Sequence, residues 1–173
     1  MSEQVSENFI SVSERLKRFK PNSGRRTVKH YPTGIKKLDQ MLGGGLYAGL
    51  MFLGARPGMG KSTFALQIAS EIAAAGSPVL FYSLEMPSVR MEAKILNRAI
   101  HMRYPNSSLT ADWFLREENN TGKQKEWKLV EKVGEEISGS FDRMYIKERK
   151  KLSVSGRDIV QDVEMFMNEK KEK

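Results

Sequence analysis

Residues 55–62 read Ala55-Arg-Pro-Gly-Met-Gly-Lys-Ser62, and this octapeptide decides how the chain around it is expected to fold. Its two glycines let successive backbone N–H groups face an anion that a side chain at those positions would obstruct. Residues 61–75 follow with the spacing of a helix, whose N-terminal N–H groups and dipole favour negative charge. The pattern predicts a phosphate-binding loop; a glycine-rich turn with an exposed lysine is the alternative.

The predicted nucleotide-binding residues are this loop and the residue after it: Ala55, Arg56, Pro57, Gly58, Met59, Gly60, Lys61, Ser62 and Thr63. Lys61 is expected to reach the β- and γ-phosphates, which makes it a catalytic as well as a binding candidate. The hydroxyl of Ser62 is expected to ligate magnesium. The cofactors that the pattern implies are therefore ATP and Mg²⁺.

Two apolar runs flank the loop and its helix. Residues 49–55 read Gly-Leu-Met-Phe-Leu-Gly-Ala, and residues 78–85 read Pro-Val-Leu-Phe-Tyr-Ser-Leu-Glu. Continuous apolar runs of this length are typical of strands covered on both faces. Pro87 then opens another helix toward His101. The order strand, helix, strand, helix predicts an α/β fold, with a parallel sheet and helices on both of its faces.

Further elements are expected on either side of this core. Thr33 can cap a short helix that the glycines at 43–45 terminate. The remaining predicted elements are helices over 110–118 and 126–138, a short strand over 144–146, and a last helix capped by Ser155.

The first 29 residues are expected to form a separate unit. Residues 1–20 carry apolar residues spaced alternately four and three apart, on one helical face: Val5, Phe9, Val12, Leu16 and Phe19. Residues 21–29 hold a proline, a glycine and three basic residues, and are typical of a linker. The chain thus divides into an amphipathic helix with a basic linker (1–29) and an α/β domain (30–173). The apolar stripe must pack either on its own domain or on a neighbouring subunit.

Composition narrows the classes of function. The 173 residues suffice for one domain, and a 39% hydrophobic and 29% charged content is ordinary for a folded protein. The absence of cysteine excludes disulfides and cysteine nucleophiles, and two histidines disfavour a histidine metal site. No apolar run reaches the roughly 20 residues of a membrane helix, so we expect a cytoplasmic protein without a membrane partner. The net charge of +8 suits a nucleic acid partner or simply a basic surface.

Glu85 directly follows the second apolar run. Ligands of a parallel sheet lie beyond the carboxyl ends of its strands, so Glu85 is expected near the γ-phosphate if its strand adjoins that of the loop. A carboxylate there can orient an attacking water or accept its proton, which makes Glu85 the second catalytic candidate. A helix-capping or surface glutamate would have the same spacing.

The stretch Pro78-Val-Leu-Phe-Tyr-Ser-Leu-Glu-Met-Pro87, placed after the loop, resembles the ATPase domain of DnaB-like replicative helicases. Residues 33–39, Thr-Gly-Ile-Lys-Lys-Leu-Asp, are similar to the segment leading into this core in DnaB, RadA and KaiC-like proteins. The resemblance is strongest over residues 31–90 and looser over 142–164.

This resemblance implies a RecA-like P-loop NTPase fold, with Glu85 as the catalytic carboxylate. It implies ATP hydrolysis coupled to unwinding of single-stranded or forked DNA in a complete, hexameric ring. The N-terminal helix resembles the one with which such helicases grip the adjacent subunit. A RadA- or KaiC-like ATPase, and a non-catalytic nucleotide-binding protein, remain open alternatives.

The second half of the family pattern has no counterpart in the sequence. The pattern continues with an apolar strand ending in aspartate, DNA-contacting loops and an arginine finger, and no segment after Ile159 fits it. We therefore expect an apparently truncated domain, the N-terminal portion only. Because an arginine finger alone contributes about 10³- to 10⁵-fold in rate, nucleotide binding should survive better than hydrolysis.

Two basic clusters and two tryptophans could in principle contact nucleic acid. The clusters are Arg25, Arg26 and Lys29, and residues 149–151. No aromatic residues interleave them, so solvated segments are favoured over a stacking platform. Trp113 and Trp127 fall on predicted helices and are favoured as packing residues.

Overall fold

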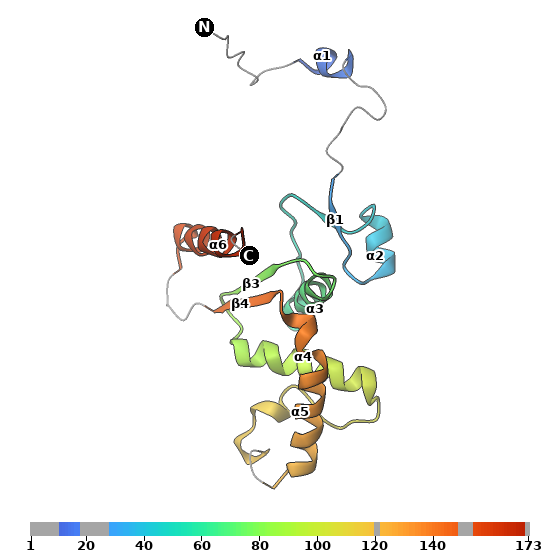
Figure 1. Cartoon of the computed structure of the whole chain (residues 1–173), viewed down its shortest axis with the longest axis vertical. Coiled ribbons are helices and arrows are strands. Elements are labelled where there is room, and N and C mark those ends of the chain that lie inside the picture. The colour runs from blue at the N-terminus through green and yellow to red at the C-terminus, as the bar shows by residue number, and fades with distance from the viewer. Residues whose placement is uncertain (1–10, 18–27, 120–121, 149–153, 172–173) are drawn as a thin grey trace.

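Two strands form a parallel sheet at the centre of the fold (Figure 1). β3 (Val79–Ser83) and β4 (Met144–Glu148) pair from Val79 opposite Met144 to Ser83 opposite Glu148. The computed structural model describes residues 11–17, 28–119, 122–148 and 154–171. Both strands and their parallel pairing confirm the prediction from sequence.

One face of this sheet is covered by α3 (Lys61–Ala74) and α4 (Ser88–Arg103). The hydroxyl of Ser70 on α3 lies 3.9 Å from the sulfur of Met144 on β4. Because successive side chains of a strand face opposite sides, the residue after Met144 faces away from α3. The sheet therefore has a second face for another helix.

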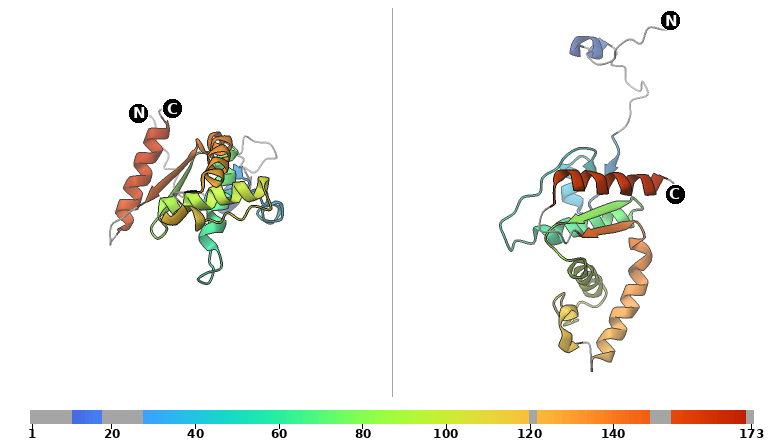
Figure 2. Two further views of the ribbon diagram at one scale, coloured as in Figure 1. Left: turned by 90° about the horizontal axis from the view of Figure 1, so that it is seen from below. Right: turned by 90° about the vertical axis from the view of Figure 1, so that its left-hand side faces the viewer.

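The second face is covered by α6 (Gly156–Lys171), which lies across the sheet (Figure 2). Tyr82 on β3 donates a hydrogen bond of 2.8 Å to Asp162 of α6. The rings of Tyr145 and Phe166 pack with centroids 5.1 Å apart. Within the described chain, the predicted α/β layering, helices on both faces of a parallel sheet, is thus confirmed.

Ser155 caps this last helix, as predicted. Its hydroxyl accepts a hydrogen bond from the backbone N–H of Asp158 at 3.3 Å. The Asp158 carboxylate in turn accepts from the Ser155 N–H at 2.9 Å. The two residues satisfy one another's donors at the helix start, in the manner of a capping box.

The helices that lie between β3 and β4 in the sequence form a core of their own. α5 (Gln124–Ser138) packs along the C-terminal half of α4, and Ile100 and Val133 are completely buried between them. The buried members of this core are Ala99, Ile100, Leu109, Val130, Val133 and Ile137. η3 (Gly139–Phe141) then leads into β4.

The predicted helix over 110–118 is wrong. Two short 3₁₀ turns, η1 (Trp113–Leu115) and η2 (Glu117–Asn119), occupy its place. The side chain of Asn119 donates to the carbonyl of Trp113 at 2.9 Å, and the indole of Trp127 donates to the carbonyl of Asn119 at 2.7 Å. These bonds hold the segment in a tighter turn than an α-helix allows. The two indole rings pack 5.2 Å apart, so both tryptophans are packing residues as predicted.

The N-terminal part of the domain is a short antiparallel pair around a helix. β1 (His30–Tyr31) pairs with β2 (Leu46–Tyr47), and α2 (Lys36–Met41) lies between them in the chain. Gly45 has a φ of +127°, and a Cβ there would collide with the backbone carbonyl of Tyr31. This turn therefore requires glycine.

Thr33 does not occupy the cap position that we predicted for it. The N-cap of α2 is Ile35, without a side-chain cap bond. The fully buried Thr33 instead accepts from the Ile35 N–H at 3.2 Å and donates to Asp39 at 2.7 Å. Thr33 thus orders the chain two residues ahead of the N-cap, because its hydroxyl has the half-buried Asp39 carboxylate as an acceptor.

The predicted buried strand over 49–55 is also wrong. Residues 50–56 have no regular secondary structure, and the side chains of Leu50 and Phe52 are 82% and 89% exposed. An apolar strand is buried on both faces only where neighbouring strands extend the sheet beside it. Within the described residues β3 pairs with β4 alone, so no strand supports this segment.

α1 (Val12–Lys17) is the described part of the predicted N-terminal helix. Val12 and Leu16 are exposed, so this part of the apolar stripe does not pack on the domain. Val5, Phe9 and Phe19 lie outside the described residues, as do Arg25, Arg26 and residues 149–151 of the basic clusters.

Candidate nucleotide-binding site

The glycine-rich loop runs directly into α3, as its sequence predicts. Gly58 and Gly60 have φ angles of +78° and +84°, in the left-handed region that favours glycine. Apart from its chain neighbours, no atom of the described residues lies within 4 Å of where a Cβ would stand at either position. Glycine is therefore favoured at these two positions by the backbone conformation that leads into the helix, and not by crowding from neighbouring atoms.

The start of α3 presents free backbone donors. The first hydrogen bond of the helix runs from the N–H of Phe64 to the carbonyl of Gly60, at 2.9 Å. The N–H groups of residues 61–63 precede that bond and have no acceptor within the helix. Together with the helix dipole they form an anion-receptive end, so the donors fit the phosphate chain of a nucleotide.

The loop and Glu85 line one cavity of about 430 Å³. Its walls include every predicted nucleotide-binding residue except Met59, which is 73% exposed and lies outside it. The residues that line the cavity are Ala55, Arg56, Pro57, Gly58, Gly60, Lys61, Ser62, Thr63, Glu85, Met86 and Lys94. The folded chain thus brings the catalytic candidates Lys61 and Glu85 to the same space.

Glu85 sits in a short turn that follows β3. The hydroxyl of Ser83, buried at the strand end, accepts from the Met86 N–H at 3.1 Å and donates to the Met86 carbonyl at 2.7 Å. These bonds close the turn around Glu85, whose own side chain is exposed. Glu85 therefore lies at the carboxyl edge of the sheet, where ligands of parallel sheets bind.

Two further residues of this region were not singled out by the sequence. Glu148, the last residue of β4, accepts a hydrogen bond from the N–H of Ser88 at 3.0 Å and so caps α4. Lys94, further along α4, donates from its ammonium to the hydroxyl of Thr63 at 3.1 Å. The strand register and the helix crossing create both contacts, and neither has a local sequence signal.

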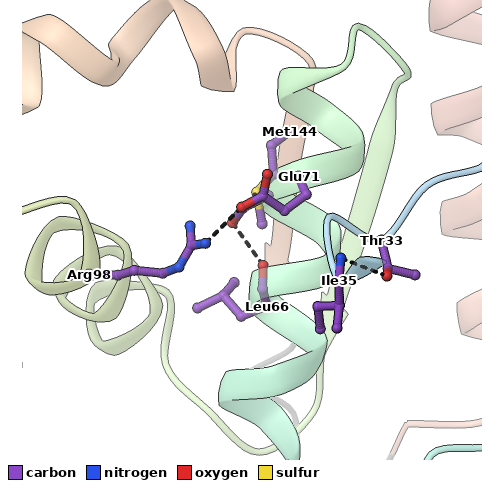
Figure 3. Close-up of polar contacts among 7 residues, drawn as sticks. Thr33, Ile35, Leu66, Glu71, Arg98 and Met144 are labelled. Carbon is purple, nitrogen blue, oxygen red and sulfur yellow. Dashed lines mark hydrogen bonds and ion pairs between the residues drawn. The ribbon is translucent and has the colours of Figure 1, made fainter. Parts of the chain in front are cut away.

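An ion pair ties α4 to α3 almost three turns along α3 from the loop (Figure 3). The guanidinium of Arg98 lies 2.7 Å from the carboxylate of Glu71, with both side chains more than a third exposed. Such a half-solvated pair contributes up to about 1 kcal/mol. Its importance is geometric, because it fixes the helix that carries Lys94 against the helix that begins at the loop.

A metal ion would depend on the phosphates for most of its ligands. Among the described residues there is no group of three histidine, cysteine, aspartate or glutamate side chains that could hold one. Ser62 supplies a single hydroxyl at the cavity wall. Magnesium is ordinarily held by one or two protein groups together with nucleotide phosphates, so this donor set fits Mg²⁺ only as a nucleotide complex.

The fold and the site together define an α/β protein with a glycine-rich loop beside the carboxyl edge of its parallel sheet. The chain belongs to the family of the DnaB-like helicase C terminal domain, which matches residues 31–171. The resemblance drawn from the sequence is thereby confirmed. No helix in the described part of the chain combines the length and apolar character needed to cross a membrane.

The relatives include proteins of two groups. "Replicative DNA helicase DnaB" of Haemophilus influenzae is 34% identical over 93 residues, which is 53% of this chain and 19% of that protein. The same-named protein of Buchnera aphidicola is 34% identical over 95 residues, 54% of this chain and 20% of that protein. "DNA repair protein RadA" of Mycolicibacterium smegmatis is 48% identical over 59 residues, 34% of this chain and 13% of that protein. The matches thus cover a fifth or less of these relatives, and no solved structure matches the chain.

Proposed function

We propose that this chain is the ATP-binding portion of a DnaB-like replicative helicase motor. The observation that carries the proposal is the shared cavity of the loop, the start of α3 and Glu85, in a chain of the DnaB-like family. A RecA-like P-loop arrangement would place the phosphates against the free N–H groups of residues 61–63.

Each predicted residue then has a distinct task. The ammonium of Lys61 binds the β- and γ-phosphates, while the hydroxyl of Ser62 holds Mg²⁺ on the same phosphates. Bound magnesium would neutralise charge that develops as the γ-phosphoryl group leaves. Glu85 orients an attacking water and accepts its proton.

We infer that the isolated chain binds nucleotide better than it hydrolyses it. Glu85 is the only acidic side chain that lines the cavity among the described residues, so magnesium has no second carboxylate near it. For the complete protein we propose a single-stranded or forked DNA substrate, a hexameric ring gripped through the N-terminal helix, and a cytoplasmic location. Proteins named as DnaB helicases among the relatives support this proposal.

A RadA-like ATPase is the second candidate, because the RadA of Mycolicibacterium smegmatis shares 48% identity over its matched stretch. ATP turnover with and without single-stranded DNA separates the two candidates. If the chain belongs to a helicase motor, we expect DNA to stimulate its ATP turnover. If it is a RadA-like ATPase, we expect the same turnover with and without DNA.

The basic test is a titration of the full chain with a fluorescent ATP analogue and magnesium. Saturable binding that unlabelled ATP displaces and AMP does not would support a site for the polyphosphate. No binding at millimolar nucleotide would overturn the proposed function.

A further inference from the structure

The cavity beside the loop contains a cation that the sequence motif does not supply. Three basic residues line this cavity: Arg56 and Lys61 from the loop, and Lys94 from the middle of α4. Lys94 is half-buried, and its ammonium donates to the hydroxyl of Thr63 at 3.1 Å. A residue far from the loop in sequence thus brings positive charge to the wall of the proposed phosphate site.

The position of Lys94 is fixed by the contacts of α4. Glu148 caps the first turn of the helix through the N–H of Ser88. Arg98, four residues after Lys94 and therefore on the same helical face, pairs with Glu71 of α3 at 2.7 Å. This face of α4 consequently lies against α3, and Lys94 is the residue of α4 that lines the loop cavity.

The bonding of Lys94 leaves its charge uncompensated. Within the described residues it forms no ion pair, and Thr63, its hydrogen-bond partner, is neutral. An ammonium has three donors, and an anionic oxygen accepts a stronger hydrogen bond than a hydroxyl does. A flexible four-carbon stem lets the ammonium turn from one acceptor to another.

We propose that Lys94 is a second phosphate-binding cation, which exchanges the Thr63 hydroxyl for an oxygen of the polyphosphate when nucleotide binds. The inference rests on the proposed function, since it names a further residue of that same site. It also assigns α4 a role, because a phosphate held by Lys61 at the start of α3 and by Lys94 on α4 links the two helices through the ligand.

The test compares Lys94→Met with Lys94→Arg and with Lys125→Met. Methionine keeps the apolar stem and removes the charge, and arginine restores the charge. Lys125 is an exposed lysine on α5, away from the cavity, and serves as the matched control. The full chain is titrated with Mg-ATP and with magnesium tripolyphosphate, which lacks the base and sugar, and each variant is melted without ligand.

Lys94→Met is expected to lower the affinity for both ligands by about tenfold, which is the lower end of the range for losing a hydrogen bond to a charged group. The affinity of Lys94→Arg should stay within about threefold of that of wild type, and Lys125→Met should have the affinity of wild type. The melting temperatures of all variants without ligand should equal that of wild type.

Three results would overturn the inference and leave the proposed function standing. In the first, Lys94→Met binds both ligands with wild-type affinity while Lys61→Ala fails to bind. In the second, Lys94→Met binds ATP more weakly but tripolyphosphate as wild type does. In the third, Lys94→Met and Lys94→Arg lose affinity equally and both have lowered melting temperatures. If wild type binds neither ligand, the proposed function and this inference both fall.

Discussion

At the scale of single residues, the two catalytic candidates should separate cleanly by experiment. Lys61→Ala is expected to abolish binding of Mg-ATP, because the variant loses the ammonium assigned to the β- and γ-phosphates. A fluorescent-nucleotide titration measures this, with Lys125→Ala as the control for a lost surface charge. Equal affinities of Lys61→Ala and wild type would refute the assigned role.

Glu85→Gln tests the other candidate. The amide keeps the size and exposure of the side chain but can no longer accept a proton, so nucleotide affinity should be unchanged. Whatever ATP turnover the chain has should fall by about 10²-fold or more, within the range of general acid–base catalysis. Phosphate release at saturating Mg-ATP is the measurement, and turnover equal to that of wild type would remove Glu85 from its role.

At the scale of elements, the segment ahead of α2 depends on one carboxylate. The Asp39 carboxylate accepts from both the N–H and the hydroxyl of the fully buried Thr33, at 2.8 and 2.7 Å. Asp39→Ala would leave these two donors buried without their acceptor, which costs about 1–3 kcal/mol. Asp39→Asn retains an acceptor oxygen and should lose less.

Urea unfolding monitored by tryptophan fluorescence gives the free energy of unfolding of each Asp39 variant. Asp39→Ala should lower the midpoint without changing the slope, as expected when only stability changes. An unfolding free energy equal to that of wild type in Asp39→Ala would show that the Thr33 donors find other partners.

Elements with a local signal could be predicted from the sequence, and elements that depend on distant neighbours could not. The periodicity of α3, α4 and α5 and the Ser155 cap are properties of short segments, and all were predicted. The apolar run at 49–55 also has the local signal of a strand, but pairing requires a neighbouring strand that the described chain does not provide. Lys94 was missed for the same reason, since its place at the cavity depends on how α4 crosses α3.

At the scale of the whole molecule, the exposed run ahead of the loop should govern how the chain behaves in solution. Leu50 and Phe52 expose 82% and 89% of their surface, and their segment has no strand beside it in the described chain. Unpaired, extended apolar segments of this kind are templates for association between chains. We therefore expect concentration-dependent self-association of the isolated protein.

Replacing both residues, as Leu50→Ser with Phe52→Ser, should shift the protein toward monomer by removing the apolar surface while leaving the loop and α3 intact. Val160→Ser is the matched control, since Val160 is also exposed, at 56%, but lies on a helix whose backbone is already hydrogen-bonded. Sedimentation velocity over a range of protein concentrations measures the outcome. A wild-type chain that stays monomeric at the highest concentration, or a control that dissociates as fully as the double variant, would show that this segment does not drive association.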